Sequence, residues 1–265
     1  MMRMARVITN QSYAIGYEEA GTSGAVPIIF LHGVGSNRSV WRPQLAHFGR
    51  MRRTVAFDYP GYGDSDPAPE GTTRDDYASA IIAAMHELGI DRAHICGLSL
   101  GGVVAIAMHH ADAKRCASLI LADTFAAHPQ GEAIYERAMT SSENLRAMAE
   151  ARVDMLLAQP AAPRVRREVV ETMAGIDPGA YCIGAEAVWL ADQRELAKEI
   201  RVPTLVLFGD QDLITPPELS DELAGLIPNS HIQAIEDAGH ISNLEKPAEF
   251  NQAIDQFIGQ LETQA

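Results

Sequence analysis

The segment Gly97–Gly102 (GLSLGG) places a serine at the centre of a turn between a strand and a helix. An apolar, strand-like run at Ala93–Cys96 precedes it, and a helix-like run follows from Val103 to His110. So short a turn strains the backbone of its central residue, and the glycines two positions to either side remove side chains that would collide there. In this context the G-x-S-x-G pattern is typical of a nucleophile elbow. The sequence therefore predicts that Ser99 carries a nucleophilic hydroxyl at the end of a strand.

Strand and helix patterns alternate through the first half of the chain. Apolar runs at Val26–Leu31 and Ala117–Ala122 are typical of strands that are covered on both faces, and Arg53–Asp58 indicates a further strand. A helix is expected from about Thr73 to Leu88, because threonine can cap its start and a glycine follows its end. This alternation predicts an α/β fold with a mostly parallel, doubly wound sheet and helices on both faces.

The pattern changes between residues 124 and 200. This stretch is rich in Ala, Glu, Arg and Met, shows helical periodicity and contains no convincing strand. We expect a helical cap at 124–200, inserted after the sixth strand, because so long an interval without a strand is hard to fit into a doubly wound sheet. The alternative is that these helices only continue the layers of the core. The core itself is predicted to comprise residues 1–123 and 201–265.

A serine hydroxyl needs a base to accept its proton and a third group to orient that base. Loops at the carboxyl edge of the sheet are the expected source of both. We predict His240 as the base, because it follows a glycine in a loop between a late strand and a helix. For the acid we favour Asp212, after the strand that ends at Phe208, over the nearby Asp210 and over Asp123. The resulting chain order of Ser, Asp and His is that of a known type of catalytic triad.

The negative charge that develops on a substrate carbonyl oxygen needs hydrogen-bond donors. One is expected to be the backbone N–H of Leu100, directly after the nucleophile. The other is expected in the loop His32–Ser36, where we select the N–H of Val34. Each donor of this kind contributes about 3 kcal/mol to catalysis. We expect His32 to hold this loop by hydrogen bonds and to take no part in the chemistry.

These motifs make the chain resemble the α/β-hydrolase superfamily over nearly its whole length, and within it the 3-oxoadipate enol-lactonase group. The resemblance implies hydrolysis of a small lactone or ester through an acyl-enzyme, by a triad of Ser99, His240 and Asp212, without cofactor or metal. The motifs that match the superfamily are Leu31–Gly33, Gly97–Gly102, Gly209–Asp212 and Gly239–His240. The runs that support the lactonase group are Cys96–Gly102, Asp212–Pro217 and Gly239–Glu245.

Composition limits the partners. The formal net charge of -14 disfavours nucleic acid and anionic membrane surfaces. No apolar stretch approaches the length that spans a bilayer, and the first residues lack the apolar segment of a secretion signal. The cysteines are widely spaced and suggest neither a metal site nor an oxidising compartment. We therefore expect a cytoplasmic enzyme for a small ester or lactone, with no nucleic-acid or membrane partner; monomer and homo-oligomer both stay open.

Two other functions fit the same motifs. The first is hydrolysis of a carbon–carbon bond in a ring-cleavage product, which uses the same triad. Enzymes of that kind carry an aromatic residue just after the catalytic histidine, whereas Ile241 and Ser242 stand there in this chain. The second is a ligand receptor without catalytic turnover, because a fold can be retained when its activity is not.

Overall fold

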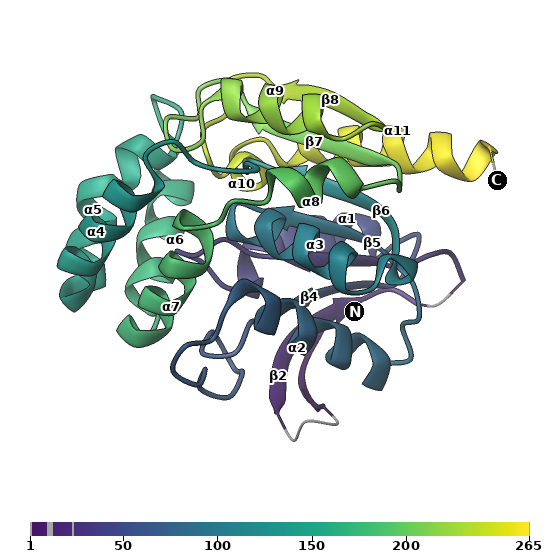
Figure 1. Cartoon of the computed structure of the whole chain (residues 1–265), viewed down its shortest axis with the longest axis horizontal. Helices are drawn as coiled ribbons and strands as arrows, with labels where there is room; N and C mark the ends of the chain where they lie inside the picture. The colour runs from purple at the N-terminus through teal and green to yellow at the C-terminus, as the bar shows by residue number, and fades with distance from the viewer. Residues whose placement is uncertain (1, 10–12, 23, 265) are drawn as a thin grey trace.

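The computed structural model describes residues 2–9, 13–22 and 24–264. Within these residues the chain forms one eight-stranded sheet with the order β1-β2-β4-β3-β5-β6-β7-β8 (Figure 1). The strands are β1 (Arg3–Ile8), β2 (Ala14–Ala20), β3 (Ile28–Leu31), β4 (Thr54–Phe57), β5 (Ala93–Leu98), β6 (Cys116–Ala122), β7 (Thr204–Gly209) and β8 (Ser230–Ile235).

The sheet is parallel from β4 to β8, and only β2 pairs antiparallel with its neighbours β1 and β4. Every residue of β3, β4, β5 and β6 is buried, as expected for strands with helices on both faces. The predicted mostly parallel α/β fold is thus confirmed. The edge strand β1 was not predicted, because none of its residues is fully buried and only Ala5 and Val7 pack partly against the core.

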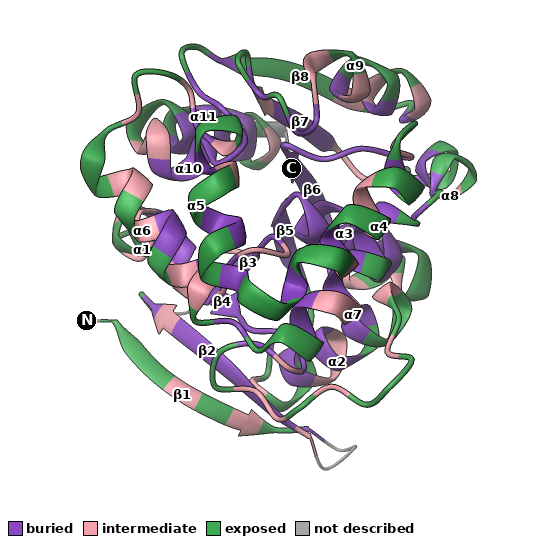
Figure 2. Cartoon of the chain, turned by 90° about the vertical axis from the view of Figure 1, so that its left-hand side faces the viewer, coloured by how far each residue is buried: buried purple, intermediate pink, exposed green. Residues whose placement is uncertain are grey.

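Helices cover both faces of the sheet. On one face α2, α3, α8 and α9 pack side by side, and on the other α1 packs against α11 (Figures 1 and 2). The helices are α1 (Arg42–Phe48), α2 (Arg74–Glu87), α3 (Leu100–Ala111), α4 (Gly131–Ser141), α5 (Leu145–Leu156), α6 (Pro163–Ala174), α7 (Pro178–Trp189), α8 (Arg194–Glu199), α9 (Pro217–Leu226), α10 (Ser242–Glu245) and α11 (Pro247–Gln264).

The segment between β6 and β7 is helical, as its composition predicts. Helices α4 to α7 form a group of their own at one end of the molecule, at the left of Figure 1, where α5 packs against α6 and α4 against α7. Helix α7 also contacts α2 and α3 of the layer that covers the sheet, and helix α8 lies in that layer between α3 and α9. Among the described residues, none of the helices has both the length and the apolar character that crossing a bilayer requires.

Candidate active site

Ser99 lies at a strained turn between β5 and α3. Its φ of 55° and ψ of -115° are unusual for a residue with a side chain, and such strain is often found at functional sites. The turn has no room for side chains on either side. A Cβ atom on Gly97 would lie 2.1 Å from the carbonyl oxygen of Gly101, and one on Gly101 would lie 2.1 Å from that of Leu31. Both glycines are therefore required by close backbone contacts.

The loops after β7 and β8 bring Asp212 and His240 together. Nδ1–H of His240 donates to Oδ2 of Asp212 at 2.8 Å, and both side chains are almost completely buried. The hydroxyl of Thr215 donates to the same carboxylate oxygen at 2.6 Å. The other oxygen, Oδ1, accepts the backbone N–H groups of Ile214 at 2.7 Å and Thr215 at 3.0 Å. Several hydrogen bonds thus fix the carboxylate of Asp212. The Nε2 atom of His240 takes no part in the contact with Asp212.

The charges of this pair stabilise each other. Burial alone would raise the pKa of Asp212, but attraction to His240 and hydrogen bonds from His240 and Thr215 lower it overall. Burial alone would lower the pKa of His240, but the charge and hydrogen bond of Asp212 raise it overall. The site is therefore built to hold an ionised carboxylate beside an imidazole that readily takes up a proton.

Asp123 has a different set of contacts. It is fully buried at the end of β6 and has a φ of 46°. Its Oδ1 accepts the N–H of Gly209 at 2.8 Å, and its Oδ2 accepts the hydroxyl of Ser242. These bonds tie β6 to the loops that carry Asp212 and His240. Of the three predicted candidates for the acid, the structure pairs only Asp212 with His240.

Hydrogen bonds hold the backbone of the predicted oxyanion loop, His32–Ser36, in place. His32 is fully buried, and burial lowers its pKa, which favours the neutral ring. Its Nδ1 lies 2.8 Å from the carbonyl oxygen of Gly33, a contact that Nδ1–H can make as a donor. The hydroxyls of Tyr59 and Tyr62 donate to the carbonyl oxygens of His32 and Val34, both at 3.2 Å. His32 therefore has the loop-holding position that the sequence predicts.

The two predicted oxyanion donors come from two different segments next to Ser99. Leu100 begins α3 directly after Ser99, and Val34 lines the cavity at Ser99. Neither backbone N–H donates a hydrogen bond to another of the described residues. The position of Gly33 brings the loop close, because a Cβ atom there would lie 3.9 Å from Oγ of Ser99. Neither N–H group is therefore committed to a partner within the described part of the chain.

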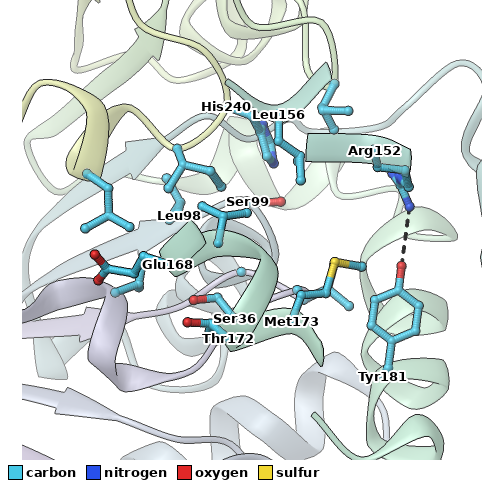
Figure 3. A pocket seen from close by; sticks show the side chains of 18 of the residues that line it. Ser36, Leu98, Ser99, Arg152, Leu156, Glu168, Thr172, Met173, Tyr181 and His240 are labelled. Atoms are coloured by element: carbon cyan, nitrogen blue, oxygen red, sulfur yellow. Dashed lines mark hydrogen bonds between the residues drawn. The ribbon is translucent and has the colours of Figure 1, made fainter. Parts of the chain in front are cut away.

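A small cavity of about 60 Å³ joins these parts, and Ser99 and His240 both line it (Figure 3). Helices α5 to α7 close it on the side away from the sheet. From the sequence, Tyr181 and Trp189 could either line a pocket from above or pack between cap helices, and packing is favoured. An arginine on a helix is ordinarily solvated, so Arg152 carries no such signal. The residues that these helices contribute are Arg152, Leu156, Glu168, Val169, Thr172, Met173, Tyr181 and Trp189. Within the described part of the chain, no group of three or more His, Cys, Asp or Glu side chains is placed to hold a metal ion.

Comparisons with known proteins agree with this architecture. The chain matches the alpha/beta hydrolase family over residues 28–253. It is 28% identical to 3-oxoadipate enol-lactonase 1 of Acinetobacter baylyi, with 95% of this chain and 96% of that protein covered. It is 26% identical to an uncharacterised carboxylesterase of Bacillus subtilis, covering 90% of this chain and 81% of that protein. The crystal structure of the enol-lactonase from Burkholderia xenovorans LB400 superposes with a TM-score of 0.89 and 28% identity, covering 96% of this chain and all of that one.

Asp123 is expected to make the protein less stable as the pH rises. Burial, together with repulsion from Asp212, raises its pKa to about 8, against an ordinary 3.8. Between these two values the folded protein binds more protons at this site than the unfolded chain does, so the free energy of unfolding falls with rising pH. We expect Asp123→Asn, which keeps a neutral hydrogen-bonding group, to flatten this dependence when urea unfolding is compared at about pH 5 and about pH 8.

Asp210→Asn serves as the matched control, because Asp210 is exposed and lies only two residues from Asp212. This variant is expected to keep the pH dependence of the wild type. An unchanged slope in Asp123→Asn would show that another group causes it.

Proposed function

Because the chain belongs to the α/β hydrolase family, we propose that it hydrolyses a small carboxylic ester or lactone through an acyl-enzyme, with Ser99, His240 and Asp212 as its triad. Similarity to enol-lactonases and to a carboxylesterase supports an ester-hydrolysing enzyme. The observation that carries the finer proposal is the pairing of His240 with Asp212 beside the cavity that Ser99 also lines. No cofactor or metal takes part in this proposal.

The first half of the reaction forms the acyl-enzyme. Oγ of Ser99 attacks the carbonyl carbon of the substrate while Nε2 of His240 accepts the hydroxyl proton. Asp212 holds the ring in the tautomer with a proton on Nδ1 and stabilises the imidazolium that forms. The carbonyl oxygen becomes an oxyanion, which accepts hydrogen bonds from the N–H groups of Leu100 and Val34. The intermediate then collapses, and His240 returns the proton to the departing alkoxide.

The second half repeats the same steps with water. His240 takes a proton from a water molecule, whose oxygen attacks the acyl carbon, and the ester bond to Ser99 breaks. The proton from His240 passes to Oγ of Ser99, and the carboxylic acid is released. With a lactone the alcohol and the acid are parts of one product, so ring opening and hydrolysis give a single hydroxy acid.

We also propose that the segment 124–200 acts as a cap on a core of residues 1–123 and 201–265. The support is that helices α5 to α7 provide one side of the cavity at Ser99. Helix α8 returns the chain to the layer over the sheet, so α4 to α7 make up the covering part. The cap residues are then the ones that select among esters and lactones, whereas the elbow and the loops after β7 and β8 supply the chemistry.

Ser99→Ala is expected to abolish turnover, because the remaining groups have no nucleophile to activate. A serine-directed organophosphonate should label the wild type once, and mass spectrometry of the labelled peptide should map the adduct to Ser99. The variant should unfold at the temperature of the wild type within a few degrees. Hydrolysis that persists in Ser99→Ala would contradict the acyl-enzyme, and saturable binding of an ester without turnover by the wild type would indicate a receptor.

The pH dependence of kcat/KM is expected to show an acid limb above the ordinary histidine pKa of 6.5, because Asp212 raises the pKa of His240 and only the neutral ring accepts a proton. Asp212→Asn removes the raising charge while burial still lowers the pKa, so the limb should move to lower pH. We expect kcat to fall by about 10⁴-fold in this variant. An acid limb at the same pH in Asp212→Asn as in the wild type would show that Asp212 does not govern the titration of His240.

A substrate panel tests the reaction class. Enol-lactones and aryl esters should be hydrolysed with a rate that depends on Ser99. Vinylogous diketones, the substrates of carbon–carbon bond hydrolysis, should be turned over far more slowly. A preference for the diketones would replace the ester or lactone reaction by its carbon–carbon alternative while leaving the triad in place.

A further inference from the structure

A second cavity lies directly beside the one at Ser99. Its volume is about 670 Å³, more than ten times the 60 Å³ at the serine. Three side chains, Arg152, Trp189 and Ile214, line both spaces and form the partition between them. The first space holds only a few atoms around the reacting carbonyl, whereas the second has the volume of an ordinary small-molecule site.

The lining of the second cavity is mainly apolar. It lies between helices α4, α5 and α9 and the loop after Asp212. Two of its apolar side chains remain exposed to solvent, Met155 at 48% and Leu213 at 65%, although large apolar residues are usually covered. Exposed apolar residues that gather in one place mark a contact with another protein, a membrane or a ligand, and here they lie at a cavity that adjoins the one at Ser99. The apolar lining residues are Ile134, Met148, Met155, Trp189, Leu213, Ile214 and Leu219.

The charged side chains at the second cavity are two arginines, Arg137 and Arg152, and one glutamate, Glu218. Arg152 also lines the cavity at Ser99, together with Glu168. Because most of the lining of the second cavity is apolar, burial of apolar surface is the main attraction that it offers to a ligand. The lining therefore fits an apolar chain.

Of the three partition side chains, Trp189 and Ile214 are buried, and Arg152 is the one held by a weak contact. Arg152 is half-buried, and its Nη1 donates to the hydroxyl of Tyr181 at 3.4 Å, which is long for a hydrogen bond (Figure 3). No carboxylate among the described residues lies within ion-pair distance of its guanidinium. A long arginine side chain with so few fixed contacts can turn aside at small cost, and the two cavities then form one elongated site.

We propose that the second cavity binds an extended apolar chain of the substrate, whose carbonyl lies at Ser99. The natural substrate is then an ester or lactone with a chain too long for the space at the serine. This inference rests on the proposed function and adds the substrate class to it. The chain enters past Arg152 and lies between α5 and the loop after Asp212.

Ala151→Trp tests the proposal, because Ala151 lines the second cavity and not the first. The measured quantity is the ratio of kcat/KM for a long-chain ester to that for an acetate-sized one. It is measured with p-nitrophenyl octanoate against p-nitrophenyl acetate, and with octyl acetate against ethyl acetate. Filling the cavity should lower this ratio at least about tenfold in one of the two series. The affected series shows whether the acyl part or the alcohol part of the substrate occupies the cavity.

Two further variants keep the test decisive. Ala147→Trp is the matched control, because Ala147 is an exposed alanine one turn earlier on α5 and lines neither cavity. It should leave the ratio unchanged. Ser141→Trp fills the second cavity from α4 and should lower the ratio as Ala151→Trp does, which covers the case that Ala151→Trp fails to fold.

The outcomes separate this inference from the proposed function. Hydrolysis of the acetate that depends on Ser99, with an unchanged ratio in both filling variants, would overturn the second cavity as a chain site and leave the ester hydrolase intact. A lowered ratio in Ala151→Trp and Ser141→Trp, together with an unchanged ratio in Ala147→Trp, would establish the second cavity as a chain site. Absence of any hydrolysis that depends on Ser99 would overturn both.

Discussion

Two buried carboxyl groups beside one imidazole hold the site together. Burying a charge is costly unless hydrogen bonds and an opposite charge replace the lost water. Asp212 meets this condition through His240, Thr215 and the backbone of its own loop. Asp123 meets it differently, because its raised pKa lets it take up a proton near neutral pH. The ends of β6, β7 and β8 are thereby fixed relative to one another, and the geometry at Ser99 depends on that.

Local sequence signals predicted that Ser99, Asp212 and His240 follow the ends of strands, and the structure has them there. In a parallel sheet the carboxyl ends of strands meet at one edge, so motifs far apart in the chain can be placed together before any coordinates are known. The edge strand β1 escaped prediction because it buries no residue. Arg152 and the second cavity escaped for another reason. Helical periodicity identifies an apolar face, but it does not say whether that face packs against a core or leaves a space.

The proposed catalytic groups and the side chains that line the cavities lie in parts of the chain that are packed differently. The proposed catalytic groups lie on loops at the ends of buried strands, where hydrogen bonds fix Asp212 and His240, so we expect this part to tolerate little change. The cavities are instead lined by short helices between β6 and β7, whose contacts to the sheet are fewer and whose side chains point at the ligand space. The proposed cap therefore shapes the space for a ligand, whereas the proposed triad lies on the core.

The covering helices are nevertheless connected to the loop that carries His240. The backbone N–H of His240 donates to the carbonyl oxygen of Leu156 at the end of α5, at 2.8 Å. Glu245 bridges the same two segments, because its carboxylate accepts the N–H groups of Gly239 at 2.9 Å and Ala158 at 2.7 Å. The carboxyl end of α5 is thus fastened beside the proposed base. Any opening that admits a long substrate must therefore occur through side chains such as Arg152 or through the other covering helices, because displacing α5 as a whole would displace His240 with it.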